Sequence, residues 1–299
     1  YLKMKSIHIF GISTPVGQSF KEILNSFYKT KNIFCYSRSG DPYIKYDLKI
    51  PNKSIIKNLQ KNTIIISFAP IWDISNFFKY LYSFDKSIIK NINSVILLSS
   101  TSILTKKFST NKFDKDLYNK LRISEDYITN LSQKFKFNLS IIRPTLIYGS
   151  INDYSDQNIT KIGKLMKIFP VIFFPKDTGL RQPIHIRQLG EVIYQIYDYF
   201  ENNKKKSQVR VIEVGGDTSL SYLDMVYAIR DNLIKTKKIS FCRIIKIPNK
   251  IFYFLTFPIF LISPKIFESF LRIQANLSGF STYSIITNKK PLKFPVENI

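Results

Sequence analysis

Short apolar runs alternate with amphipathic segments along the first half of the chain. The runs that predict strands are residues 7–10, 33–36, 64–68, 95–98 and 139–142. Between them, segments 17–28, 75–84 and 116–134 place apolar residues three or four positions apart, which is the spacing of one helix face. Strands joined through helices run parallel in one sheet, with helices on both faces. The alternation therefore predicts an α/β fold with a doubly wound parallel sheet.

The pattern changes after Gly149. Helices are predicted over 158–169 and 188–200 and strands over 171–174 and 209–214. A further helix is predicted to start at Ser221, whose hydroxyl would cap it with Asp224 three residues on. No independent linker separates the two halves. We therefore expect a sheet domain over residues 1–150 and a smaller lobe over residues 151–299, interleaved with the end of the sheet.

The chain is strongly basic. It has 299 residues, with 45 Lys and Arg against 21 Asp and Glu, and a net charge of +24. Such an excess attracts anionic partners, but it also arises from compositional drift toward lysine. The lysines are scattered, Lys204–Lys206 is the longest run, and no aromatic nucleic-acid-binding motif is present. We expect an anionic small molecule as partner and no nucleic acid.

Two cysteines, Cys35 and Cys242, have neither metal-ligand spacing nor the number for a disulfide framework. We expect buried thiols, no metal site and a reducing, cytoplasmic location. Residues 1–5 are too few for a signal sequence before the first strand.

One segment is unusually apolar and aromatic, residues 251–262, and no stretch reaches the length of a membrane span. Basic residues flank it: Lys246, Lys250, Lys265 and Arg272. Two interpretations stay open. The segment is a helix packed on the core of the lobe, or it makes peripheral contact with an anionic membrane at its inner face.

The turn after the first strand carries glycines. Gly11 to Gly17 follows a strand and opens a helix, where backbone N–H groups bind a pyrophosphate. Thr14 takes the place of the usual middle glycine and is followed by Pro15 and Val16. In this context we expect the turn to bind a dinucleotide.

Arg38 follows the second predicted strand, where the ribose of a dinucleotide would lie. An arginine there binds a 2′-phosphate, stacks on adenine or points to solvent. It favours NADP over NAD. Asp47, just beyond, would take the adenine amino group or remain a solvated loop acid.

Together these motifs resemble the extended short-chain dehydrogenase/reductases, also called the NAD-dependent epimerase/dehydratase family, over residues 6–230. The resemblance is closest to its nucleoside-diphosphate-sugar epimerase subgroup. It rests on the order of Gly11…Gly17, Ser67–Pro70, Ser99–Ser102, Arg143–Gly149, Asp153 with Asn158–Ile159, Gly179–His185 and Gly215–Gly216. It implies a Rossmann-type sheet with a small substrate lobe.

The resemblance also implies roles for single residues. Thr101 matches the hydroxyl that orients the reacting oxygen. Phe68, Ala69, Pro70, Ser99 and Pro144 match the wall of the cofactor site. Ser100 and Ser102 fall beside the substrate, and Asn158 and Arg181 match positions that hold its diphosphate. His185 matches a landmark that we interpret as structural, and Gln188 replaces the acid that usually follows it.

The general base departs from the family pattern of a tyrosine followed four residues later by lysine. The best match is Tyr118 with Arg122. Arginine supplies the charge but not the geometry of lysine. Three interpretations stay open. Tyr118 and Arg122 are a working variant of the pair, another group acts as the base, or the site binds a cofactor without catalysing a reaction.

The resemblance implies an NAD(P)-dependent sugar-nucleotide epimerase, dehydratase or reductase. Its substrate would be a nucleotide sugar, with a lipid-linked sugar as a variant, and a homodimer is compatible. The alternative is a catalytically silent NAD(P)-binding scaffold or membrane-associated accessory protein.

Overall fold

The computed structural model describes residues 6–27, 32–109, 111–156, 158–203 and 207–296. The predicted helix end at Tyr28, the lysine run 204–206 and the side chain of Lys265 lie outside the described residues. The chain divides into two compact units. Unit 1 combines Tyr1–Pro144 with Arg187–Glu213, and unit 2 combines Thr145–Ile186 with Val214–Ile299. The chain therefore returns to unit 1 after its first visit to unit 2, so the two units alternate along the sequence.

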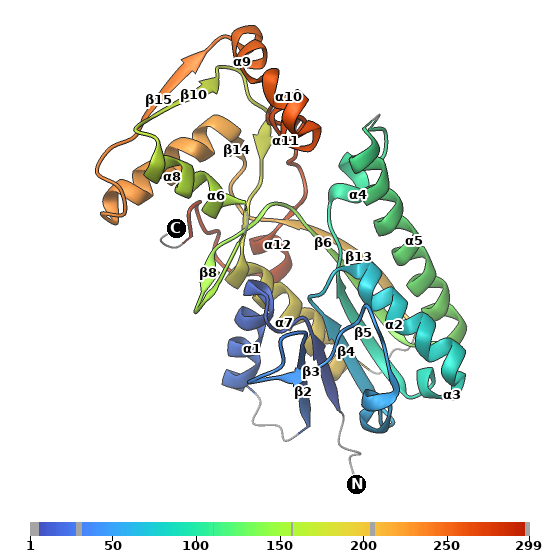
Figure 1. The fold of residues 1–299 in the computed structure, drawn as a ribbon. Coiled ribbons are helices and arrows are strands. Elements are labelled where there is room, and N and C mark those ends of the chain that lie inside the picture. The colour runs from blue at the N-terminus through green and yellow to red at the C-terminus, as the bar shows by residue number, and fades with distance from the viewer. Residues whose placement is uncertain (1–5, 28–31, 110, 157, 204–206, 297–299) are drawn as a thin grey trace. The chain divides into compact units, whose positions relative to one another are not determined.

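A parallel sheet forms the centre of unit 1 (Figure 1). Its strand order is β3-β2-β1-β4-β5-β6-β13. The strands are β1 (Ile7–Phe10), β2 (Ile33–Ser37), β3 (Ile44–Lys45), β4 (Thr63–Ser67), β5 (Ile92–Leu98), β6 (Asn138–Pro144) and β13 (Val209–Gly215). The pairings from β3 through to β6 are all parallel. The order reverses between β1 and β4, which is the switch point of a Rossmann-type sheet.

One more strand completes the eight-stranded sheet. β16 (Ser281–Thr282) pairs in parallel with Val214 and Gly215, the residues of β13 that belong to unit 2.

Helices cover both faces of the sheet in unit 1 (Figure 1). On one face lie α1 (Pro15–Phe27) and α7 (Ile186–Asn202), where the rings of Phe20 and Tyr197 are 6.5 Å apart. On the other lie α2 (Ile71–Phe84), α3 (Lys86–Ile89) and α5 (Lys112–Phe135). Val95 and Leu97 of β5 join the core against α2 and α5, since alternate strand residues point to opposite faces.

The predicted α/β fold is confirmed, and the structure extends several elements. α2 begins at Ile71 rather than at residue 75, and α5 begins at Lys112 rather than at residue 116. Apolar periodicity detects only the core-facing part of a helix, whereas its start depends on capping. Asn111 caps α5 by accepting hydrogen bonds from the amides of Phe113 and Asp114.

Unit 2 is built around two helices, α6 (Ile159–Ile168) and α8 (Tyr222–Lys235), whose apolar side chains form its core. Ser221 caps α8 as predicted, accepting from the Asp224 amide at 3.0 Å. A parallel pair, β10 (Val171–Pro175) and β15 (Arg243–Ile247), lies beside this core. Shorter strand pairs complete the unit: β7 (Ile147–Tyr148) with β12 (Ile184–His185), β8 (Ser150–Ile151) with β9 (Tyr154–Ser155), and β11 (Leu180–Arg181) with β14 (Leu220–Ser221).

The C-terminal part of unit 2 contains short helices that the periodicity did not predict: α9 (Asn249–Thr256), α10 (Pro258–Ile262), α11 (Pro264–Leu271) and α12 (Tyr283–Thr287). The apolar run 251–262 is broken at Pro258, which begins α10. A run that is apolar on every side has no contrast between an apolar and a polar helix face. The spacing of apolar residues therefore does not predict the helices in it.

Candidate functional site

The carboxyl ends of β1 and β4 meet at the switch point. Gly11 directly follows β1 and has a φ of +69°. A Cβ on Gly11 would lie 2.6 Å from the amide nitrogen of Ala69, which follows β4. A Cβ on Gly17 would lie 2.8 Å from the Gly11 carbonyl oxygen. Only glycine fits at both positions. The two glycines let the turn approach the end of β4 and the start of α1 closely, at the switch point where sheets of this kind bind ligands.

Thr14 changes what this turn offers an anion. Its hydroxyl donates to the Gly11 carbonyl at 2.9 Å and accepts from the Gly17 amide at 3.1 Å. Thr14 thus caps α1, and Pro15 follows in the first helical position, where it has no N–H. Because the cap occupies one donor and the proline lacks another, the turn presents fewer N–H groups than a three-glycine turn.

Polar side chains gather at the ends of β1 and β2. The Ser37 hydroxyl lies 3.1 Å from that of Ser13 and 2.8 Å from that of Ser39. Arg38, between two of these serines, is exposed. Three hydroxyls and an exposed guanidinium form a surface suited to an anion.

Asp73, which the sequence interpretation did not single out, belongs to the same region. It lies in the first turn of α2 and is 8% exposed. Burial raises the pKa of its carboxyl, and the positive charges of Lys49 and Arg38 oppose that rise. Asp47, the predicted adenine contact, also acts on it, by repulsion. The four charges are therefore close enough to influence one another. A helix predicted from residue 75 places Asp73 outside it, whereas α2 begins at Ile71.

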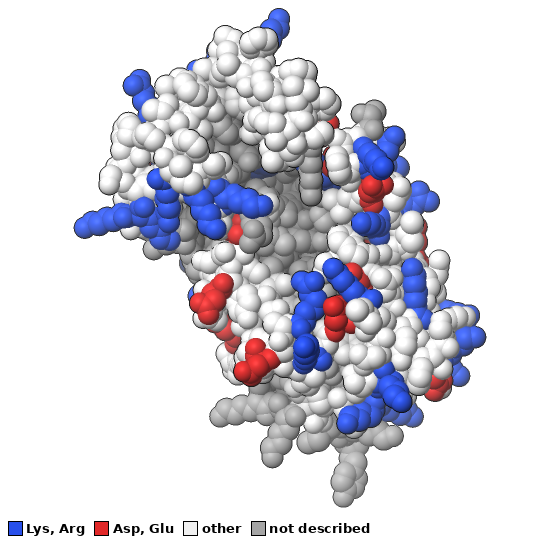
Figure 2. All heavy atoms as spheres, viewed as in Figure 1, with Lys and Arg blue, Asp and Glu red and all other residues white. Residues whose placement is uncertain are grey.

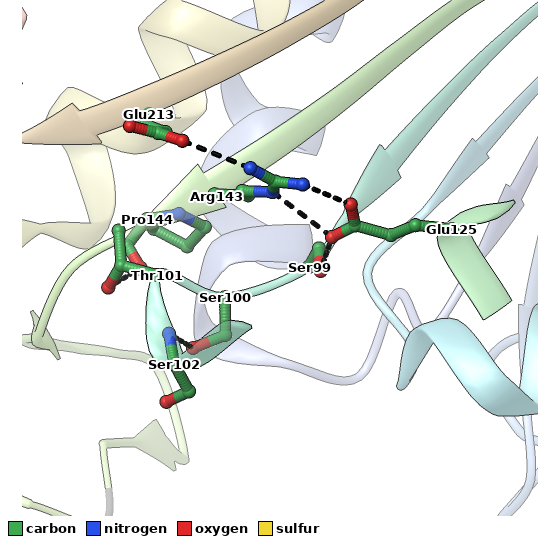
Figure 3. A network of polar contacts seen from close by, with 8 residues as sticks. All are labelled: Ser99, Ser100, Thr101, Ser102, Glu125, Arg143, Pro144 and Glu213. Atoms are coloured by element: carbon green, nitrogen blue, oxygen red, sulfur yellow. Dashed lines mark hydrogen bonds and ion pairs between the residues drawn. The ribbon is translucent and has the colours of Figure 1, made fainter. Parts of the chain in front are cut away.

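The hydroxyl cluster after β5 consists of Ser99, Ser100, Thr101 and Ser102, and its side chains point in different directions (Figure 3). Ser99 donates to the Glu125 carboxylate at 2.5 Å. The Thr101 hydroxyl, by contrast, donates to the Pro144 carbonyl at 3.1 Å and is buried. Ser100 accepts from the amide of Ser102 at 3.1 Å. The ends of β5 and β6 are thus joined through Thr101 and Pro144.

An ion-pair network that the sequence interpretation missed lies beside Ser99. The Glu125 carboxylate, 5% exposed, receives Arg143 at 2.5 Å, and Arg143 also reaches Glu213 at 3.0 Å. Burial lowers the pKa of the Arg143 guanidinium, but its bonds to both carboxylates outweigh this and raise it. A signal was present in the sequence, since Glu125 falls at helical spacing between the apolar Leu121 and Ile128.

Tyr118 and Arg122 are neighbours on α5. A hydrogen bond to Tyr118 is the largest contribution that raises the pKa of the Arg122 guanidinium. The Arg122 side chain is 60% exposed and forms an ion pair with Asp126 at 3.6 Å. Tyr118 is half-buried and packs against the core of unit 1. Two of the three predicted catalytic residues, Tyr118 and Arg122, are therefore adjacent, with the Arg122 cation facing solvent.

Arg181 is built into the interior of unit 2. It is 4% exposed, and its guanidinium donates to the carbonyls of Leu180 at 2.7 Å, Arg272 at 2.6 Å and also Ala275. Its plane lies over the Tyr222 ring, 4.8 Å from the centroid. Burial lowers the pKa of this guanidinium. In the structure the fork therefore binds backbone, and its predicted diphosphate contact would require it to exchange these partners.

The neighbours of Arg181 in the motif hold the same C-terminal segment. The Gln182 side chain accepts from the amides of Gly279 and Phe280 and donates to the Phe280 carbonyl. A Cβ on Gly179 would lie 2.2 Å from the Ala275 carbonyl oxygen. The stretch from Gly179 to Gln182 thus holds residues 272–280 against the rest of unit 2.

Asp156, also missed, organises the start of α6. Its carboxylate accepts from the amides of Asn158 and Ile159, each at 2.7 Å. The side chain of Asn158, a predicted diphosphate contact, does not cap the helix, and the residue is exposed. His185 is buried, with its ring 5.0 Å from that of Tyr148.

The predicted residues divide between the units. The cofactor wall, Thr101, Tyr118 and Arg122 belong to unit 1, and Asn158 and Arg181 belong to unit 2. Within the described residues no cluster of His, Cys, Asp and Glu is arranged to hold a metal ion. Burial raises the pKa of both Cys35 and Cys242, and both are free thiols.

No protein-family model and no curated protein sequence matches the chain. Solved structures do match it in fold. A UDP-galactose 4-epimerase aligns with a TM-score of 0.65 at 11% identity, over 99% of this chain and 96% of that one. A dTDP-glucose 4,6-dehydratase from Bacillus anthracis, in complex with NAD, aligns with a TM-score of 0.58 at 12% identity, over 99% and 94%.

A third match is a mutant of UDP-glucuronic acid 4-epimerase from Bacillus cereus, in complex with NAD and a fluorinated UDP-sugar. It aligns with a TM-score of 0.62 at 16% identity, over 96% of this chain and 94% of that one. The chain therefore has the fold of sugar-nucleotide epimerases and dehydratases along nearly its whole length.

Proposed function

We propose that this protein is an NAD(P)-dependent enzyme that acts on a nucleotide sugar by reversible hydride transfer at a sugar carbon. The observation that carries the proposal is the glycine turn at the switch point, where Gly11 and Gly17 pack so closely against backbone that neither has room for a side chain. Of the structures of similar fold, the dehydratase is in complex with NAD, and the UDP-glucuronic acid 4-epimerase mutant is in complex with NAD and a fluorinated UDP-sugar.

The residues at the strand ends fit a dinucleotide. The Gly11–Gly17 turn would hold the pyrophosphate, with fewer backbone donors than usual because of Thr14 and Pro15. Ser13, Ser37, Ser39 and Arg38 would receive a 2′-phosphate, which favours NADP. When bound, the nicotinamide supplies the site with a reversible acceptor for hydride.

Thr101 would orient the reacting oxygen of the sugar. In the structure its hydroxyl donates to the Pro144 carbonyl, and it would exchange this acceptor for the oxygen of the reacting substrate hydroxyl, which leaves the substrate proton available for transfer. Tyr118 would take the proton of that substrate hydroxyl. The adjacent Arg122 cation would stabilise the phenolate form of Tyr118 that accepts this proton.

Isothermal calorimetry with NAD and NADP tests the binding step. Gly17→Ala should abolish binding, because its Cβ would meet backbone oxygen at 2.8 Å. Gly163→Ala is the matched control, since a Cβ at this helical glycine meets only Leu233 Cδ1 at 3.5 Å. Wild-type protein that binds neither dinucleotide would refute the proposal.

Turnover of a panel of UDP- and dTDP-sugars tests the chemistry. Interconversion of two sugars, or release of a dehydrated or reduced sugar, is the expected result. Tight dinucleotide binding with no turnover on the whole panel would favour the catalytically silent scaffold, and the exposure of Arg122 is the feature that would then explain it.

A further inference from the structure

The helices α9, α10 and α11 expose an unusual number of large apolar side chains. We call the following set the apolar face: Ile251 49%, Phe254 79%, Leu255 58%, Phe257 54%, Phe260 42%, Leu261 78%, Ile262 85%, Ile266 52% and Leu271 41% exposed. Figure 2 shows this part of the molecule, at the top of the view, as predominantly uncharged. Soluble proteins keep single apolar side chains at the surface, whereas clusters of this kind mark interaction sites.

The three helices form one body rather than three loose segments. The Phe267 ring of α11 lies 6.1 Å from that of Phe257 and 5.7 Å from that of Phe260. The Phe252 ring of α9 lies 5.8 Å from that of Phe270. The aromatic contacts thus hold the backbone of the apolar face in place while its outer side chains remain exposed.

The helix α10 has the clearest exposure. It runs from Pro258 to Ile262, and none of its residues is buried. Phe260, Leu261 and Ile262 are consecutive and all exposed. No helix in the described part of the chain is long and apolar enough to cross a membrane.

The charge around the apolar face distinguishes between two partners that would cover it, a second copy of the chain and an anionic bilayer. From Arg243 to Arg272 the sequence has five basic residues, the other three being Lys246, Lys250 and Lys265, and a single acid, Glu268. Lys246 and Lys250 are exposed. A second copy of the same face would bring these like charges together, at a cost. A bilayer surface with anionic headgroups complements them instead.

We propose that α9–α11 dock on the surface of an anionic lipid bilayer. The apolar face would enter the boundary between headgroups and acyl chains, with the helices lying in the plane of the membrane. The side chains of Lys246 and Lys250 would stay among the headgroups. This proposal does not depend on the chemistry proposed above, because it uses only the surface of unit 2.

Vesicle flotation of the full chain tests the docking. The probes are vesicles of phosphatidylcholine alone and vesicles that also contain phosphatidylserine. The chain should float with the second kind at low salt and much less with the first. Lys246→Gln and Lys250→Gln should each lower the partition coefficient by about fivefold. Lys53→Gln and Lys57→Gln, exposed in the 3₁₀ helix η1 (Lys53–Asn58), are the matched controls.

The apolar contribution needs its own variant. Leu261→Ser with Ile262→Ser removes two side chains that are 78% and 85% exposed, so folding should be unaffected. Flotation should fall by about tenfold or more, since each side chain would otherwise leave water. The control pairs Phe108→Ser with Ile123→Ser, 86% and 59% exposed in unit 1, and should float like wild type.

Three outcomes would overturn the proposal. One is wild-type protein that does not float with anionic vesicles at low salt. Another is equal flotation of the Leu261→Ser/Ile262→Ser variant, which would mean that charge alone binds. The third is sedimentation showing a dimer that only this variant dissociates, which would assign the apolar face to a second copy.

Discussion

Arg143 holds the carboxylate of Glu125 with two of its nitrogens, Nη2 at 2.5 Å from Oε2 and Nε at 3.2 Å from Oε1. The same carboxylate receives the Ser99 hydroxyl. The contact joins the ends of β5 and β6 to α5, all within unit 1. The hydroxyl cluster that begins at Ser99 is therefore anchored by a buried ion pair.

Replacing Glu125 should destabilise the protein. Glu125→Gln leaves Arg143 partly buried with Glu213 as its remaining carboxylate, and breaking a buried pair costs about 3 kcal/mol. Urea unfolding measures this loss. Asp126→Asn is the control, because its side chain is 66% exposed and should change the free energy of unfolding by about 0.5 kcal/mol or less. Equal effects of the two variants would contradict the anchoring role.

Arg38 should set the preference for NADP. In Arg38→Ala we expect the affinity for NADP to fall by about tenfold or more, because a charge-assisted contact to the 2′-phosphate is lost. The affinity for NAD should change little. Calorimetry with both dinucleotides measures the difference, with exposed Lys53→Ala as control. Equal losses for the two would instead mean that Arg38 stacks on adenine.

Tyr118 should be the general base. Tyr118→Phe and Thr101→Val are each expected to lower turnover by about a hundredfold, the scale for positioned acid–base groups. Tyr127→Phe, a half-buried tyrosine on the same helix, should retain activity. If Tyr118→Phe is fully active, the base lies elsewhere on the chain.

Arg181 should stabilise unit 2. In Arg181→Lys the three carbonyls that share the guanidinium lose their fork, and we expect the free energy of unfolding to fall by about 2 kcal/mol. The exposed Arg243→Lys is the control. A raised KM for the nucleotide sugar with unchanged stability would instead support the diphosphate contact.

His8 should make stability depend on pH. It is fully buried beside Tyr36, and burial lowers its pKa from 6.5 to about 4, against an opposing hydrogen bond to the Asn58 carbonyl. The unfolded chain takes up the proton near pH 6.5 and the folded chain does not. Stability is therefore complete above pH 6.5 and falls as the pH drops toward 4.

Between pH 7 and pH 5 this effect should amount to about 2 kcal/mol in the free energy of unfolding. His8→Gln should lack that part of the pH dependence, whatever its stability at pH 7. Urea titrations of both proteins at the two pH values provide the comparison. Parallel pH dependences would show that His8 does not contribute.

The sequence alone determined the parallel sheet of unit 1 and the glycine turn at its switch point. Alternating apolar runs and helical faces predicted the parallel strands, because burial on both faces leaves a local period that needs no knowledge of distant contacts. The glycines at 11 and 17 indicated a close approach of backbones, and the structure has Gly11 against Ala69. The apolar run 251–262 was visible in the sequence. Its residues have no helical periodicity, so the sequence did not show whether they are buried in the core or exposed to solvent.

The tertiary structure decided which polar groups meet. Glu125 finds Arg143 eighteen residues away, Asp73 lies near Arg38 and Lys49, and Arg181 reaches the carbonyls of residues 272 and 275. None of these partners lies within the reach of a local pattern. An ion pair or a buried fork depends on where two distant segments pack, so its chemistry appears only once the chain has folded.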